Sequence, residues 1–340
     1  SFSFASFSFC IIGGTGIIST AVTQLAIERG IDLSLLNRGQ SKRLVPNEVK
    51  VIKGDIRDRK AASKLLKMHD FDVVVNWVAF VPTHVEADIE FFRGKVGQYI
   101  FISSASAYQK PAAHWLITES TPLANPYWQY SRDKIACEDR LMAEYRSNGF
   151  PVTIVRPSLT YGVTMIPAAI NSWQKPWTIV DRMRKGKKVI IHGDGLTLWT
   201  MTHNTDFARG FLGLMGNVQS IGNAVHITSD EALTWNQIYQ AIADAARVEL
   251  KPVHISSDFI TKIDPEQTGT LLGDKSCCAI FDNTKIKRLV PDFVATVPFA
   301  QGVRRSIEWF EADEERRVVD EEYNKFMDRT IAAYEKALPK

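Results

Sequence analysis

A tyrosine and a lysine four residues apart are the side chains of this sequence best suited to chemistry. Tyr130 and Lys134 stand in a stretch with helical spacing, which places them on one helix face. A phenol has a pKa of about 10, and a nearby ammonium favours the phenolate and brings the group into the range of acid–base catalysis. The pattern therefore predicts an acid–base tyrosine with a lysine partner, the alternative being an ordinary pair on a helix surface.

Small hydroxyl side chains follow the apolar run at 99–102. A serine at a strand end can hydrogen-bond a substrate oxygen while hydride passes at the carbon, and Ser104 is our candidate for that role. Ser103 and Ser106 are alternatives, since only geometry separates neighbouring hydroxyls. This division of labour leaves the redox chemistry to a cofactor.

A glycine-rich turn supplies a place for that cofactor. Gly13, Thr15, Gly16 and Ile17 stand between an apolar run and a stretch with helical spacing. There the backbone N–H groups and the helix dipole can hold a pyrophosphate. Ser19 occupies the third glycine position of the pattern, a small residue that still permits close packing of the helix.

Two later strand ends bear on the choice of cofactor. Where an NAD site often places an acidic residue, Asn37 and Arg38 stand instead. Arg38 favours NADP over NAD, although an arginine in a surface turn is an equally good explanation. After the next strand, Asp55 and Ile56 are placed to reach the adenine edge, and a helix N-cap is the alternative role for Asp55.

The elements that position these residues alternate between strands and helices. Short apolar runs predict strands at 9–12, 33–36, 49–52, 73–78, 99–103, 152–155 and 224–227, and helical spacing predicts helices at 17–29 and 60–68. This order predicts an α/β fold with a doubly wound parallel (Rossmann) sheet. We expect a dinucleotide-binding domain at 9–165 and a smaller, mainly substrate-binding portion at 166–340, with segments near 200–230 returning to the sheet.

Bulk properties exclude several classes of protein. The chain has 340 residues and a net charge of +3, which creates no field that would recruit nucleic acid or membrane. Its four cysteines have no metal-ligand spacing, so we expect no metal and a reducing, cytoplasmic setting. No apolar run reaches the roughly 20 residues of a membrane span. The alternating start at 1–9 lacks the basic residues of a signal peptide, and we assign it no function.

Taken in order, these motifs resemble the extended short-chain dehydrogenase/reductase family, the NAD-dependent epimerase/dehydratase group. The resemblance covers roughly residues 9–295 and implies Ser104 as the catalytic hydroxyl, Tyr130 as the acid–base and Lys134 as its activator. It also places Val78 and Ala79, in a strand-end loop, and Pro157, after the next strand, beside the cofactor. We therefore expect an NAD(P)-dependent enzyme acting on a secondary alcohol or ketone of a small molecule, with a homodimer as the assembly to test.

Departures from the family bear on the substrate. Trp199 and Leu271 stand where members acting on nucleotide sugars carry arginines for the diphosphate. Trp199, Trp173, Trp177 and Met165 are candidates to line an apolar or sugar-stacking pocket, and a place in the core is an equally good explanation. One alternative is a nucleotide-sugar epimerase with a replaced clamp, for which Arg182 and Arg184 are candidates. A second follows from the shortened helix at 83–97, which resembles divergent chloroplast RNA-binding members and suggests a catalytically silent dinucleotide- or RNA-binding module.

Overall fold

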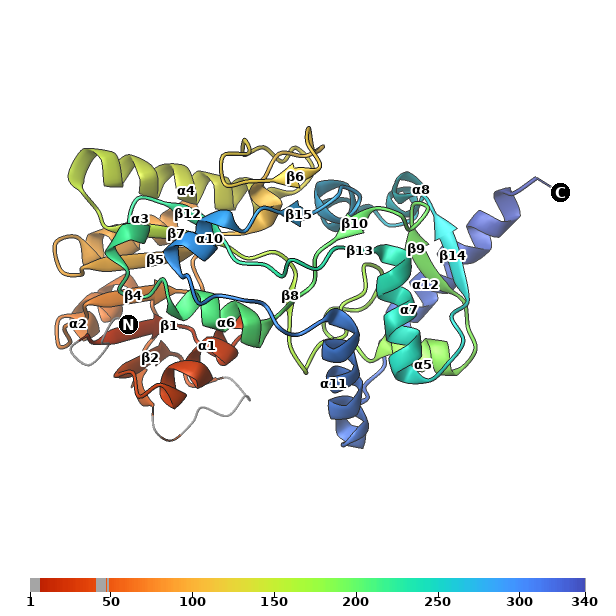
Figure 1. Cartoon of the computed structure of the whole chain (residues 1–340), viewed down its shortest axis with the longest axis horizontal. Coiled ribbons are helices and arrows are strands. Elements are labelled where there is room, and N and C mark those ends of the chain that lie inside the picture. Colours follow the sequence, from red (N-terminus) through yellow and green to blue (C-terminus); the bar gives the residue numbers. More distant parts are fainter. Residues whose placement is uncertain (1–6, 41–46, 48, 340) are drawn as a thin grey trace.

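A seven-stranded parallel sheet forms one part of the molecule, and a smaller helical part lies beside it (Figure 1). The computed structural model describes residues 7–40, 47 and 49–339, so most of the serine- and phenylalanine-rich start lies outside the described residues. The strands of the sheet are β1 (Phe9–Ile12), β2 (Leu33–Asn37), β3 (Lys50–Lys53), β4 (Val73–Asn76), β5 (Gln98–Ile102), β7 (Val152–Arg156) and β12 (Ala224–His226).

The order of these strands fixes where a ligand can bind. The sheet runs β12-β7-β5-β4-β1-β2-β3, and β1 pairs in parallel with both β2 and β4. The winding of the chain therefore reverses between β1 and β4. In doubly wound folds the crevice at the carboxyl ends of the strands beside such a reversal is the ligand site. The expected doubly wound parallel fold is confirmed.

Helices cover both faces of the sheet because its strands alternate their side chains between two cores. Phe9 and Ile11 of β1 belong to one core and Cys10 and Ile12 to the other, as the two-residue repeat of a strand requires. The first face carries α1 (Ile17–Glu28), α6 (Asn204–Leu212) and α10 (Thr284–Leu289). The second carries α2 (Arg59–Leu66), α3 (Pro82–Phe92) and α4 (Gln129–Asn148).

The smaller part has a hydrophobic core of its own, which is shared by its helices and by the β9–β14 pair. Its helices are α5 (Thr178–Arg184), α7 (Trp235–Ala246), α8 (Ser257–Ile263), α9 (Thr268–Thr270), α11 (Phe299–Glu311) and α12 (Glu321–Ala337). Its paired strands are β9 (Val189–His192) with β14 (Pro252–Ile255) and β10 (Leu198–Trp199) with β13 (Leu233–Thr234). Two further pairs lie between the parts, β8 (Thr160–Tyr161) with β11 (Thr202–His203) and β6 (Leu116–Ile117) with β15 (Ile280–Phe281).

Two elements differ from the expected ones: β4 is shorter than predicted, and α10 packs beside the sheet. The run predicted as a strand at 73–78 ends at Asn76, because the Oδ1 atom of Asn76 accepts a hydrogen bond from the Val78 N–H at 2.8 Å and turns the chain. The region near 200–230 supplies β12, which pairs with β7. A second return, through α10, was not anticipated and places Ile286 in the core beside the sheet.

Among the residues that the structure describes, no helix is long and apolar enough to cross a membrane.

Candidate active site

The glycine-rich turn between β1 and α1 is shaped by backbone conformations that favour glycine. Gly13 and Gly14 have φ angles of +98° and +85°. A Cβ atom on Gly13 would lie 3.1 Å from the Cγ1 atom of Val78, so the turn touches the segment after β4. Gly16 is the N-cap of α1, and its N–H donates to the Oγ atom of Ser19 at 2.8 Å. The departure at Ser19 therefore closes the turn with a buried hydroxyl.

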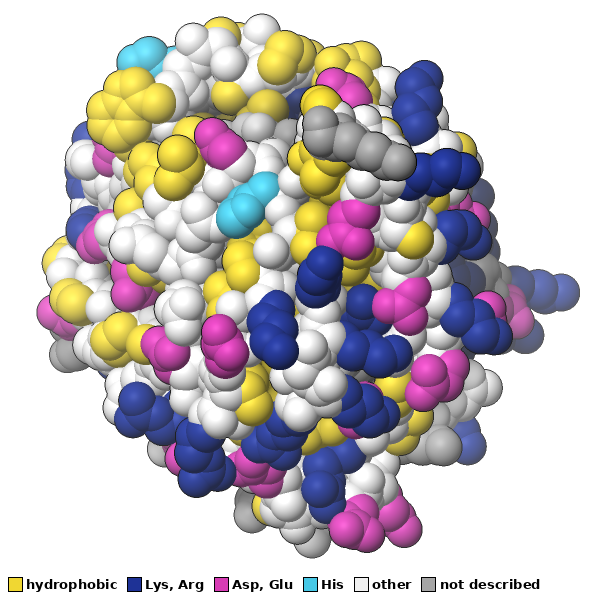
Figure 2. Space-filling model, turned by 90° about the vertical axis from the view of Figure 1, so that its right-hand side faces the viewer, with side chains coloured by type: hydrophobic (Ala, Val, Ile, Leu, Met, Phe, Trp, Pro, Cys, Tyr) yellow, Lys and Arg dark blue, Asp and Glu magenta, His cyan; other side chains and the backbone are white. Residues whose placement is uncertain are grey.

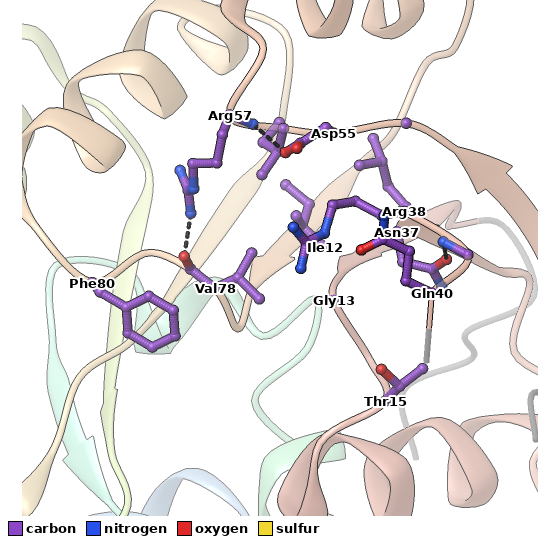
Figure 3. A pocket seen from close by; sticks show the side chains of 14 residues that line it. Ile12, Gly13, Thr15, Asn37, Arg38, Gln40, Asp55, Arg57, Val78 and Phe80 are labelled. Carbon is purple, nitrogen blue, oxygen red and sulfur yellow. Dashed lines mark hydrogen bonds between the residues drawn. The ribbon is translucent and has the colours of Figure 1, made fainter. Parts of the chain in front are cut away.

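A cavity of about 500 Å³ opens at this turn (Figure 3). Its walls include seven of the predicted cofactor residues, Gly13, Thr15, Asn37, Arg38, Asp55, Ile56 and Val78. The side chains of Arg38 and Arg57 both lie along it (Figure 3). Gly16 and Ile17 begin α1 next to the turn, and Ala79 is buried behind the wall. The close approach at Gly13 and the adjoining helix start fit a dinucleotide pyrophosphate.

The carboxylate of Asp55 is turned toward this cavity and does not cap a helix. Its Oδ1 atom accepts from the Arg57 N–H at 2.9 Å, whereas Asp58 caps α2 by accepting from the Ala61 N–H at 3.0 Å. The guanidinium of Arg57 donates to the carbonyl of Val78, across the cavity mouth (Figure 3). Asp55 therefore remains available to a ligand.

The predicted catalytic side chains come together at the ends of β5 and α4. Ser104 follows β5, and its Oγ atom lies 2.8 Å from the Oγ atom of Ser106, which lies 2.7 Å from that of Ser131 on α4. Tyr130 is in the first turn of α4 and is hydrogen-bonded to Ser104. Ser103, the other alternative, is buried, and its hydroxyl has no hydrogen-bond partner among the described residues.

The expected lowering of the phenol pKa is wrong for the protein by itself. Burial raises the pKa of Tyr130 above 10, the hydrogen bond from Ser104 lowers it, and the charge of Asp274 raises it. The Nζ atom of Lys134 lies 5.8 Å from the centroid of the Tyr130 ring, and it donates to the carbonyls of Ala79 and Ile102, both at 2.7 Å. Desolvation is the largest of these effects, so the pKa of Tyr130 stays above its ordinary value.

Lys134 is itself nearly enclosed. Burial lowers its pKa to about 8, while Cys137 and Glu138 raise it. A group with this pKa is mostly protonated at pH 7, and its side chain is 2% exposed. The rings of Phe80 and Phe101 lie 4.8 and 4.9 Å from its Nζ atom. Lys134 is therefore a fixed cation between the two strand ends and the catalytic helix.

A second cavity, of about 430 Å³, opens on the other side of Tyr130. Ser104, Ser106 and Tyr130 form one wall, and Pro157 and Leu159 form another. Pro157, predicted to approach the cofactor, lines this second cavity and not the first. Trp128, Trp173, Asp274 and Lys275 complete the cavity.

The family model for the NAD dependent epimerase/dehydratase family matches residues 9–228, about two thirds of the chain. The chain belongs to this family. Its relatives include a 2'-dehydrokanamycin reductase of Streptomyces kanamyceticus, 22% identical over 83% of this chain and 79% of the relative. They also include the chloroplast stem-loop binding protein of 41 kDa b of Arabidopsis thaliana, 25% identical over 69% of this chain and 62% of the relative.

Solved structures of epimerase/dehydratase enzymes share the fold. A dTDP-glucose 4,6-dehydratase from Bacillus anthracis in complex with NAD superimposes with a TM-score of 0.71. The match covers 92% of this chain and 98% of that one, at 19% sequence identity. The expected family, fold and NAD-dependent class of enzyme are confirmed.

The two side chains at the expected positions of the diphosphate clamp lie in the core. Trp199 and Leu271 are buried, at 1% and 0% exposure, and neither lines the second cavity. Trp199 packs on Trp235, with ring centroids 5.2 Å apart. Of the four side chains expected as pocket candidates, Trp173 alone lines the cavity, since Trp177 and Met165 are also in the core. For these three side chains the alternative, a place in the core, holds, because their spacing does not show which way they face.

Arg182 and Arg184 do not replace the missing clamp. Arg182 is buried and donates to Asp328 at 2.6 Å, and Arg184 is paired with Glu311. Lys188 pairs with Glu335 in the same way. Figure 2 shows the lysines and arginines of this end of the molecule lying among acidic side chains. The cations Arg182, Arg184 and Lys188 therefore present little uncompensated charge to a nucleic acid.

Several side chains of the site carried no signal in the sequence. Arg57 and His84 flank the first cavity, and Asp274 and Lys275 reach the second from distant segments. Tertiary packing brings them in, and only the position of Arg57 beside Asp55 was a hint. Among the described residues no group of histidine, cysteine and carboxylate side chains is arranged to hold a metal ion.

Proposed function

We propose that this chain reduces a ketone of a sugar-like small molecule, with Tyr130 as proton donor and Ser104 as the hydrogen-bond partner of the substrate oxygen. The observation that carries the proposal is the position of these two side chains on one wall of the second cavity, with Lys134 one turn further along α4. When bound, the dinucleotide supplies the hydride. The family's epimerases and dehydratases share that hydride step, so the direction is the new part of the proposal.

The protonation state of the site supports reduction. A phenol is protonated at neutral pH, and burial raises the pKa of Tyr130 further, so Tyr130 can give its proton to the carbonyl oxygen as hydride reaches the carbonyl carbon. The products are a secondary alcohol and oxidised dinucleotide. The ammonium of Lys134 stabilises the transient phenolate, and solvent then returns the proton to Tyr130.

The residues of the first cavity support NADP as the preferred dinucleotide. Gly13 and Thr15 would hold the pyrophosphate, Asp55 and Ile56 the adenine, and Arg38 the ribose phosphate. Comparing NADP and NAD affinity in Arg38→Ala and the parent tests the last assignment. NADP affinity should fall more than NAD affinity, and an equal fall would remove Arg38 as a phosphate clamp.

The second cavity supports a substrate without a diphosphate. Its cation, Lys275, already lies 3.5 Å from the carboxylate of Asp274, and both side chains are mostly buried. Trp128 and Trp173 offer flat apolar rings of the kind that pack on sugars. A relative named for reduction of a dehydrokanamycin makes a sugar ketone without a nucleotide a suitable first test.

The test is a titration of UDP, GDP and dTDP against the protein loaded with dinucleotide. We expect no measurable binding, because charge-assisted phosphate contacts are not replaced by Trp199 and Leu271. Micromolar binding of any of the three would contradict this substrate class. It would favour the second candidate, a nucleotide-sugar enzyme in which Lys275 leaves Asp274 and binds phosphate. Substitution of Lys275 by Met would then abolish that binding.

A further inference from the structure

Residues 78–80 form a wall of the first cavity after β4 has ended. Val78 and Phe80 line the cavity, and Ala79 between them is buried. A segment outside a sheet ladder must find other partners for its buried N–H and C=O groups. In residues 78–80, four of these backbone groups have side chains as partners.

Four backbone groups of this wall are hydrogen-bonded to side chains. The Val78 N–H donates to the Oδ1 atom of Asn76 at 2.8 Å, and the Val78 carbonyl accepts from Arg57. The Ala79 carbonyl accepts from the Nζ atom of Lys134 at 2.7 Å. The Phe80 N–H donates to the Nδ1 atom of His84 at 3.1 Å.

The position of this wall matters to the turn that faces it. A Cβ atom on Gly13 would lie 3.1 Å from the Cγ1 atom of Val78 and 3.3 Å from the Cβ atom of Trp77. The glycine turn and the wall are thus already in contact, and a shift of the wall moves one side of the cavity.

His84 is the one side chain among these four whose bond depends on losing a proton. It is the third residue of α3, whose N-cap Val81 makes no side-chain capping bond, and its Nδ1 atom reaches back to the Phe80 N–H. A protonated imidazole donates from both nitrogens and cannot accept this bond.

The charges around His84 oppose its protonation. Burial lowers the pKa of His84, and the cations Arg57, from the loop before α2, and Lys134, from α4, lower it further. The other titratable groups that act on Arg57 are Asp88 of α3, Tyr99 of β5 and Asp55. Those that act on Lys134 are Cys137 and Glu138 of α4.

We propose that His84 is a positioning residue for the dinucleotide, which fixes residues 78–80 against the glycine turn by accepting the Phe80 N–H. Arg57 and Asn76 hold the same wall from its other end. The inference rests on the proposed function, because it takes the first cavity as the dinucleotide site.

The test is a fluorescence titration of NADPH and NADH at about pH 8 and at steps from about pH 6.5 down to about pH 4.5, because the pKa of His84 lies below the ordinary histidine value. The parent is compared with His84→Ala, which removes the acceptor, and with His84→Asn, whose Oδ1 atom replaces Nδ1 but does not titrate. His114→Ala, at an exposed histidine whose Nδ1 bonds locally to the backbone of Leu116, is the matched control.

We expect the parent to bind about twofold to tenfold more weakly at the acid end of this range, the size of one hydrogen bond. His84→Asn should bind like the parent at pH 8 and lose none of that affinity in acid, and His84→Ala should be weak at both. Amide hydrogen exchange of residues 78–80 should rise in His84→Ala while exchange in β1 stays unchanged.

Identical pH profiles for the parent and His84→Asn, or parental affinity in His84→Ala, would overturn the inference. Failure of the parent to bind either dinucleotide would instead overturn the proposed function. The two failures are therefore distinguishable in the same titration.

Discussion

Glu138→Ala should destabilise the protein by about 3–5 kcal/mol, because it leaves the guanidinium of Arg156 buried without its counter-charge. Arg156 donates to the two carboxylate oxygens of Glu138 at 2.9 and 2.6 Å, and the two side chains are 6% and 3% exposed. Burial by itself would lower the pKa of Arg156, yet the bonds and charge of Glu138 raise it. The pair is thus strongly coupled, and Arg156 leads directly into the wall of the second cavity at Pro157.

The assay is equilibrium urea unfolding of the parent and three variants. Glu90→Ala removes an exposed ion pair, in which the side chains of Arg59 and Glu90 are 56% and 64% exposed. This change should lower the free energy of unfolding by no more than about 1 kcal/mol. The double variant Arg156→Met with Glu138→Leu should recover much of the loss, since no charge then remains buried. Equal effects of Glu138→Ala and Glu90→Ala, or a double variant worse than the single one, would refute this reasoning.

Two further predictions concern the first cavity and the core behind it. Gly13→Ala should weaken dinucleotide binding, because its φ of +98° and its contact with Val78 both oppose a Cβ atom. The control is Gly30→Ala, at a glycine with φ +67° and open space around it, which shares only the backbone cost. It should bind the dinucleotide like the parent in the same titration. Burial raises the pKa of Asp88 from 3.8 to about 6, so the folded protein holds this proton more tightly than the unfolded chain. The free energy of unfolding of the parent should therefore rise by about 1 kcal/mol relative to that of Asp88→Asn as the pH falls from about 8 to about 5. This gain is lost as the pH rises through 6. Urea unfolding of both proteins at both pH values checks this, and a difference that stays constant with pH would contradict it.

Much of the fold was predictable because its signals are local. Short apolar runs and helical spacing in the first 160 residues identified β1 to β5 and α1, and the glycine turn and Tyr130-x-x-x-Lys134 identified the candidate site. The return of α10 carried a similar signal, with Ile286, Leu289 and Val290 at helical spacing, and was missed because its sheet partner lies far away in the sequence.

The parts of the site that could not be predicted depend on how segments pack together. No spacing shows that Trp199 faces Trp235 in a core, or that burial raises the pKa of the Tyr130 phenol. The partners of Arg182 and Arg184 lie on α12 and α11, more than a hundred residues away. Burial and long-range pairing, which decide these roles, have no local signature.

The measurement that tests the central claim most directly is hydride transfer from NADPH or NADH to a panel of keto sugars without nucleotides, followed by nicotinamide absorbance, in the parent and in Tyr130→Phe. We expect the parent to oxidise the dinucleotide and Tyr130→Phe to lose about 100- to 10,000-fold in rate while binding the dinucleotide as tightly as before, because only the proton donor is removed. Turnover by Tyr130→Phe at the parental rate would contradict the assignment of Tyr130 and with it the proposed reduction.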